Sequence, residues 1–241
     1  MNVKVGRCKY VNGKIVYPND IAGYERIVVM TKGYGKWGYL SPYHLTDHKD
    51  RILENVWQFS KVYEKVPYSK QFRSRFDKTV IWEWPSEIHI ENGKLTKEYF
   101  VWRQAGMNAK DPIRYPVGYN YRHNCKCALD NQTLTPLNYI DSRKQIYLPI
   151  YCESVKNHRL FTVLKEKLER GEKLMILEVD GPHQESMSYY REKYNIDDFI
   201  ENDSIDATKE SLRILLNDDK HPFGHGYCLA IALLYDYHDF I

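Results

Sequence analysis

The chain has 241 residues, of which 43% are hydrophobic and 28% are charged, a mixture typical of a folded globular protein. Its 35 Lys and Arg residues nearly balance 32 Asp and Glu residues, so charge alone does not favour nonspecific nucleic-acid binding. We find no apolar run of about 18 residues and no signal-peptide pattern, so we expect no membrane anchor. Five scattered cysteines do not resemble a disulfide framework, which favours a reducing, cytoplasmic location.

The first part of the chain, residues 1–45, is predicted to form short strands and turns, and residues 1–33 form an N-terminal β region. The sequence Asn12-Gly13 lies between two β-branched runs and predicts a hairpin. Pro18-Asn19-Asp20 and Gly33 break the other runs. The four predicted strands cover residues 3–5, 9–11, 14–17 and 26–31.

Helices and a few further strands are predicted for the rest of the chain. The predicted helices cover residues 51–64, 96–107, 139–155, 159–170, 184–194, 207–217 and 227–235, and the predicted strands cover 79–84, 87–90 and 174–179. Pro149 has to kink or interrupt its helix, and Gly171 ends the next one. Residues 111–136 are rich in Pro, Gly, Asn and aromatics and predict a long ordered loop. We therefore expect an α+β fold that is mainly helical, with short N-terminal strands.

The strongest functional signal lies in the predicted helix 51–64. Glu54, Trp57, Gln58 and Lys61 are spaced i, i+3, i+4 and i+7, so one helix face would carry a carboxylate, a ring, an amide and a cation. This combination is typical of a polar small-molecule site. A carboxylate shielded from water holds a proton more readily, which suits proton transfer. The alternative is a surface Glu54 that pairs with a nearby lysine.

Two other segments carry candidate site residues. Asp180 follows the predicted strand 174–179, where active-site groups often lie, although it could instead stabilise a turn. Gly224 and Gly226 precede the last helix, where backbone amides favour an anion such as phosphate, although a turn without a ligand is equally consistent. His123, Cys125 and Cys127 alternate without a second pair at zinc-site spacing, so we predict no metal site. The motifs GxSxG, Walker A and HExxH are absent from the sequence, and we expect no GxGxxG pattern to open a helix.

These residues resemble the NADAR family, whose name reflects its association with NAD and ADP-ribose chemistry. The family has a Leu-Ser-Asn-Phe-like turn followed by a Glu-His-x-Tyr-Gln-x-x-Lys helix. The corresponding residues here are 40–43, which read Leu-Ser-Pro-Tyr, and 54–61, which read Glu-Asn-Val-Trp-Gln-Phe-Ser-Lys. Later family elements match, in the same order, residues 139–143, 160–171, 174–178 and 223–226. The resemblance covers roughly residues 34–235.

The resemblance implies a single NADAR-like domain over residues 1–241, with residues 77–136 as an insertion. The chain departs from the family pattern at several positions. Asn55 replaces a histidine, and Tyr139 replaces a tryptophan. The family's catalytic Asp has two candidates, Asp180 and Asp219.

By this resemblance, the chain is expected to be an N-glycosidase that hydrolyses a base–ribose bond without a cofactor or metal. Family members act on an aminopyrimidine ribosyl phosphate or remove ADP-ribose from modified guanine in nucleic acid. The implied catalytic residues are Glu54 and Asp180. The implied substrate-binding residues are Ser41, Trp57, Gln58, Lys61, Tyr139, Arg143, Gly224 and Gly226.

The expected partner is the substrate itself, an ADP-ribose-containing nucleotide or an ADP-ribosylated nucleic acid, and no obligate protein partner is predicted. Three alternatives remain open. A non-catalytic ADP-ribose or nucleotide sensor would keep the pocket without the chemistry. A nucleic-acid-binding module would use the aromatic and basic loop around Tyr115, Tyr119 and Tyr121. A structural or interaction protein would respond to no nucleotide.

Overall fold

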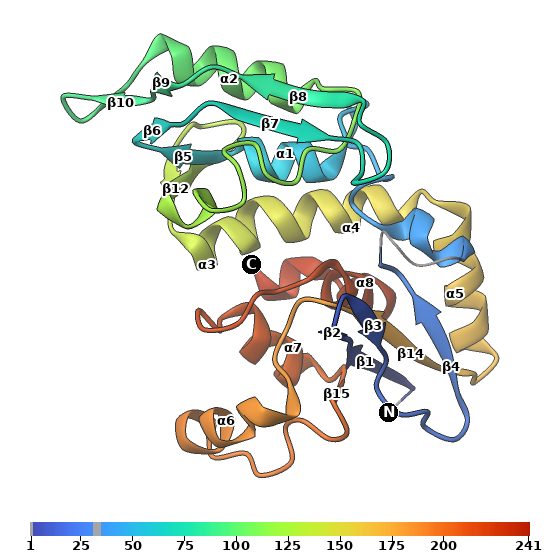
Figure 1. Cartoon of the computed structure of the whole chain (residues 1–241). Helices are drawn as coiled ribbons and strands as arrows, with labels where there is room; N and C mark the ends of the chain where they lie inside the picture. The colour runs from blue at the N-terminus through green and yellow to red at the C-terminus, as the bar shows by residue number, and fades with distance from the viewer. Residues whose placement is uncertain (1, 31–34) are drawn as a thin grey trace. The chain divides into compact units, whose positions relative to one another are not determined.

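The computed structural model describes residues 2–30 and 35–241, which form two compact units. Unit 1 contains Met1–Leu45 and Leu148–Ile241, and unit 2 contains Thr46–Tyr147 (Figure 1). Helices account for 37% of the chain and strands for 23%. The predicted α+β class is confirmed, but "mainly helical" overstates the helix content, because several predicted turns and loops form short strands.

Unit 1 is built around a four-stranded sheet with the order β15-β1-β14-β4. The central strand β14 (Lys173–Glu178) pairs in parallel with β1 (Val3–Arg7) and with β4 (Tyr24–Val28), while β15 (Ser204–Asp206) runs antiparallel to β1. β14 is buried from residue 174 to residue 178, as expected for a parallel strand covered on both faces. The apolar helix α8 (His225–Leu234) packs against β1 and β14.

Helices and one hairpin complete unit 1. The helices α4 (Leu148–Lys156), α5 (Arg159–Glu169) and α7 (Lys209–Leu216) contact α8. The other helical segments are η1 (Lys36–Leu40), η4 (Gln184–Ser186), α6 (Met187–Tyr194) and η5 (Tyr237–Phe240). The hairpin of β2 (Lys9–Val11) and β3 (Lys14–Val16) confirms the prediction at Asn12-Gly13, where both residues have positive φ. Thr31, the end of the predicted strand 26–31, and the predicted break at Gly33 lie outside the described residues.

Unit 2 encloses an aromatic core under several small sheets. Helix α1 (Leu53–Phe59) packs against α2 (Lys97–Met107), and Gly106 lies so close to the Phe59 ring that a Cβ would overlap it. Phe59 also contacts Trp82 and Trp102. The strands of unit 2 are β5 (Lys61–Tyr63), β6 (Lys65–Val66), β7 (Ser69–Phe72), β8 (Val80–Trp84), β9 (Glu87–Ile88), β10 (Ile90–Glu91), β11 (Lys94–Leu95), β12 (Cys125–Leu129) and β13 (Pro136–Leu137). They form one three-stranded sheet, β13-β12-β5, and three two-stranded sheets, β7-β8, β6-β9 and β10-β11.

Three predicted elements differ from the structure. The helix predicted over 51–64 ends at Phe59, and β5 begins at Lys61. The loop predicted over 111–136 contains η2 (Arg122–Asn124) and β12. The helix predicted over 139–155 consists of α3 (Tyr139–Ser142), a π-helical turn (Arg143–Tyr147) and α4, and the turn lies just before Pro149, which lacks an N–H donor.

Within the described residues, no helix is both long enough and apolar enough to cross a membrane. All five cysteines are free thiols.

Candidate functional site

Three polar side chains of the Glu54 motif form a continuous hydrogen-bonded chain. Gln58 Nε2 donates to Glu54 Oε1 at 2.9 Å, and Lys61 Nζ donates to Gln58 Oε1 at 2.8 Å. The Lys61 ammonium also lies 5.1 Å from the centroid of the Trp57 ring. Glu54 is only 6% exposed, whereas Trp57, Gln58 and Lys61 are partly exposed. The four residues therefore lie together, with the carboxylate at the buried end.

The predicted reason for this grouping is only partly correct, because Lys61 is not on the helix. Helix α1 ends after Phe59, where Ser60 Oγ donates to the Trp57 carbonyl at 2.8 Å. Val62 and Tyr63 then extend β5 along β12, since a β-branched and an aromatic residue favour a strand. Lys61 lies at the start of β5, and its side chain extends back to Gln58. The four side chains therefore still lie together although the helix ends before Lys61.

Unit 2 contains two aromatic contacts in addition to the hydrogen bonds that join Glu54, Gln58 and Lys61. The rings of Trp57 and Tyr147 lie 5.0 Å apart between centroids, with an interplanar angle of 43°. The Arg143 guanidinium lies 4.1 Å from the centroid of the Tyr139 ring. Arg143 is 1% exposed and Tyr139 is 48% exposed, so the ring covers a buried cation. The predicted substrate-binding pair of Tyr139 and Arg143 is thus formed within one helical segment.

Asn55, the residue after Glu54 on α1, supports a loop. Its Nδ2 donates to the carbonyls of Ala109 at 3.1 Å and Asp111 at 3.0 Å, and its Oδ1 accepts from the Ile113 amide at 2.8 Å. The side chain is fully buried. A single amide therefore satisfies three backbone groups of the segment 109–113 and fixes that segment against α1.

The segment supported by Asn55 continues to Tyr115, a residue that we did not include in the predicted site. Burial raises the pKa of the Tyr115 hydroxyl, and the Glu54 carboxylate contributes in the same direction against the lowering effect of Arg114. In the sequence, Tyr115 was predicted only as part of the aromatic and basic loop of a nucleic-acid-binding module.

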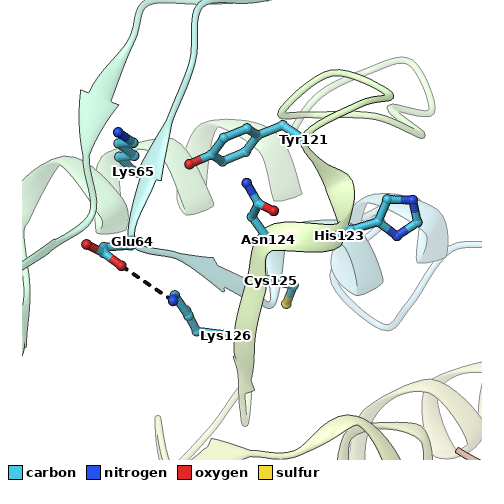
Figure 2. Close-up of a pocket in the computed structure, with 7 residues that line it drawn as sticks. All are labelled: Glu64, Lys65, Tyr121, His123, Asn124, Cys125 and Lys126. Carbon is cyan, nitrogen blue, oxygen red and sulfur yellow. Dashed lines mark ion pairs between the residues drawn. The ribbon is translucent and has the colours of Figure 1, made fainter.

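A separate hollow of about 370 Å³ opens on unit 2 next to β5 and β12 (Figure 2). Tyr121 and Asn124 point into it, while His123 points away from the other labelled residues. Glu64 and Lys126 form an ion pair at 3.4 Å across one side. The lining residues are Glu64, Lys65, Tyr121, His123, Asn124, Cys125 and Lys126. The volume lies within the range of small-molecule sites, and the lining is predominantly polar.

In unit 1, the amides predicted to bind phosphate already have an anionic partner. The Gly226 amide donates to Glu178 Oε2 at 2.6 Å, and a Cβ on Gly224 would overlap the Glu178 carboxyl group. Glu178 is fully buried at the end of β14 and also accepts from the Val179 amide at 2.7 Å. His225 Nδ1 lies 3.1 Å from Glu178 Oε2. Because these glycines have no Cβ, the start of α8 can pack closely against the buried Glu178 carboxyl group at the end of β14.

The two remaining predicted residues also lie in unit 1. Asp180 is partly buried, and its amide donates to Glu178 Oε1 at 3.2 Å. Ser41 is fully buried, and its Oγ accepts from the Tyr43 amide at 3.2 Å, so its hydroxyl stabilises its own turn. The predicted site is thus divided between the units. Glu54, Trp57, Gln58, Lys61, Tyr139 and Arg143 belong to unit 2, and Ser41, Asp180, Gly224 and Gly226 belong to unit 1.

Two groups of side chains contain atoms of the kind that bind metals. The ligand atoms of His183, Glu185 and Asp203 lie within 4.8 Å of one another. However, the Lys9 ammonium lies 2.9 Å from Glu185 and 3.1 Å from Asp203, and it supplies the positive charge there. Burial raises the pKa of both Cys125 and Cys127, which disfavours the thiolate form that metals require.

Comparisons with known proteins were made by family model, by sequence and by structure, and none of them found a match for this chain.

Proposed function

We propose that the chain is an N-glycosidase that hydrolyses a base–ribose bond, with Glu54 as its central carboxylate. The observation that carries this proposal is the chain of hydrogen bonds from buried Glu54 through Gln58 to Lys61, beside the Trp57 ring. The NADAR resemblance supports the choice of substrate, which is a modified guanine carrying ADP-ribose or a related ribosyl nucleotide.

The chemistry of the reaction matches these side chains. Cleavage of a base–ribose bond develops positive charge on the ribose, and a carboxylate stabilises that charge or activates the attacking water. Gln58 holds Glu54 Oε1 and so restricts the orientation of the carboxylate. A preorganised carboxylate in a site of low water content stabilises the transition state more strongly than one in solvent.

Substrate binding is assigned to cations and rings of unit 2. Lys61 is a compact positive charge suited to a phosphate, and the Arg143 guanidinium can bind phosphate oxygens in bidentate fashion. Trp57 and Tyr139 offer rings for stacking on a base or ribose, and Tyr139 is exposed enough to do so. Gln58 can bond a sugar hydroxyl. Ser41, Gly224 and Gly226 belong to unit 1, where each already has the internal role described above.

The proposal is tested by incubating purified protein with DNA that contains ADP-ribosylated guanine and with a panel of ribosyl nucleotides. Mass spectrometry is expected to detect ADP-ribose or ribose phosphate together with the intact, unmodified base. A phosphodiesterase would instead leave a phosphoribosyl group on the DNA. Folded protein that releases nothing from any of these substrates would overturn the proposed reaction.

A second candidate function, binding of single-stranded nucleic acid, is favoured by the loop of unit 2. The Arg122 guanidinium lies 3.5 Å from the centroid of the Tyr119 ring, and the Arg114 guanidinium lies 5.2 Å from that of Tyr115. Pairs of arginine and an aromatic ring are suited to phosphate contact and base stacking. In the substrate experiment, retention of intact DNA with an affinity that falls steeply with salt would favour this function.

A further inference from the structure

Unit 1 contains a second group of chemically complementary side chains. Asp218 and His221 are close in the sequence, and Ser186 comes from a different segment. His221 Nδ1 lies 2.6 Å from Asp218 Oδ2, and His221 Nε2 lies 3.0 Å from Ser186 Oγ. The three groups thus follow the order carboxylate, imidazole and hydroxyl. This is the arrangement in which a histidine activates a serine for nucleophilic attack.

One tautomer of His221 fits both contacts, because an Nδ1–H that donates to Asp218 leaves Nε2 as an acceptor for the Ser186 hydroxyl. The Tyr190 hydroxyl also lies 3.1 Å from His221 Nδ1. The imidazole packs against two tyrosines, with the Tyr190 ring stacked at 5.6 Å and the Tyr189 ring edge-on at 5.4 Å between centroids. These contacts restrict the orientation of the ring.

Asp218 is well placed to keep its negative charge. It is fully buried, and it accepts hydrogen bonds from the Tyr189 hydroxyl at 2.8 Å, from the Lys220 amide at 3.0 Å and from the Tyr190 hydroxyl. Burial by itself raises the pKa of this carboxyl, but the hydrogen bonds from Tyr190, His221, Lys220 and Tyr189 outweigh it, and the pKa is lowered. A charged carboxylate stabilises the imidazolium that forms when histidine takes a proton.

The position of Ser186 adds an independent observation. Ser186 is the N-cap residue of α6, but its side chain makes no capping hydrogen bond. Thr96 and Thr208, the N-cap residues of α2 and α7, have an extended backbone and accept bonds from the amides of Tyr99 and Ser211, whereas Ser186 ends η4 with φ −83° and ψ 1°. The Ser186 hydroxyl is therefore not in capping geometry, and it contacts His221 instead. It is also partly exposed, and the positive end of the α6 dipole favours negative charge beside it.

We propose that Ser186 is the nucleophile of an acyl-transfer site that acts on carboxylic esters, with His221 as its general base and Asp218 as the positioning residue. Ser186 Oγ attacks the carbonyl carbon of the ester while its proton moves to His221 Nε2. The bond to the alcohol oxygen then breaks, and His221 returns the proton to that oxygen. The acyl group remains on Ser186 until water attacks its carbonyl carbon and gives a proton to the same nitrogen. The bond to Ser186 Oγ then breaks, His221 returns the proton to Oγ, and the product leaves as a carboxylic acid. This activity is independent of the Glu54 site.

The test uses the whole chain, a fluorophosphonate probe and p-nitrophenyl acetate. In the probe reaction, Ser186 Oγ forms a bond to phosphorus and fluoride leaves. Peptide mass spectrometry is expected to find one phosphonate adduct, on Ser186, and an acetyl group on the same residue with the ester. Ser186→Ala is expected to lose both. Ser188→Ala, an exposed serine two residues along the chain, is expected to keep both.

Variants of the other two residues separate catalysis from folding. His221→Gln and Asp218→Asn are expected to slow labelling by about 100-fold or more. Tyr190→Phe removes the hydroxyl that contacts both Asp218 and His221 Nδ1 but keeps the Asp218–His221 contact, and it is expected to change the rate only a few-fold. Folded wild-type protein that forms neither adduct, or adducts that persist in Ser186→Ala, would overturn the proposal. Glu54→Gln is expected to leave the labelling unchanged.

Discussion

Glu54→Gln is expected to reduce the release of ADP-ribose or ribose phosphate by roughly 10²–10⁴-fold while ligand binding changes only a few-fold. The substitution removes the negative charge that stabilises the ribosyl cation or activates water. The fold should survive, because the new amide oxygen can still accept the hydrogen bond from Gln58 that Glu54 Oε1 now accepts. Steady-state kinetics and calorimetric titration with ADP-ribose measure the two effects separately.

A matched control for this substitution lies on the same unit. Glu64 is exposed and pairs with Lys126 beside the hollow of Figure 2. Glu64→Gln is expected to keep turnover within a few-fold of the wild type. Wild-type turnover in Glu54→Gln would remove Glu54 from the mechanism, whereas an equal loss in both variants would point to a nonspecific charge effect.

Asn55→Ala is expected to lower the free energy of unfolding by roughly 3 kcal/mol, because three backbone groups of the segment 109–113 lose their partner. Asn55→His, which introduces the residue of the resembling family, is not expected to restore stability. A neutral imidazole has one donor and one acceptor, whereas Asn55 uses two donors and one acceptor here. Denaturant unfolding curves give the comparison.

The control for this prediction is the exposed residue Asn124, whose replacement by alanine should change stability by less than about 0.5 kcal/mol. Asn55→Ala should also impair turnover, because Asn55 joins the segment 109–113 to α1, the helix that carries Glu54. A fully stable Asn55→His protein would show that the three hydrogen bonds do not support the loop as described.

The group of Glu54, Trp57, Gln58 and Lys61 shows how much of the candidate site could be predicted from the sequence. Helical spacing correctly placed Glu54 and Gln58 on the same helix, α1, where their side chains form a hydrogen bond. It did not predict the end of that helix after Phe59, because the pairing partner of β5 is β12, more than 60 residues away in the sequence. Lys61 joins the group only because its side chain is long enough to reach back from the strand.

Other parts of the structure depended on tertiary contacts that local patterns do not encode. The spacing of Gly224 and Gly226 is explained by the buried Glu178 carboxylate, which belongs to a strand distant in the sequence. Asn55 could not be recognised as a loop support without knowing where residues 109–113 lie. Ser186, Asp218 and His221 form no local motif, so only their distances reveal them. In contrast, the hairpin at Asn12-Gly13 follows from two residues that tolerate positive φ.

The most direct test of the proposed N-glycosidase is a crystal structure of Glu54→Gln with an uncleaved oligonucleotide that contains ADP-ribosylated guanine. We predict that the substrate is intact, that its ribose C1″ lies about 3–3.5 Å from the side chain of residue 54, and that a ring of the substrate stacks on Trp57. A substrate whose C1″ faces a different carboxylate, or one bound away from α1, would contradict the assignment of Glu54.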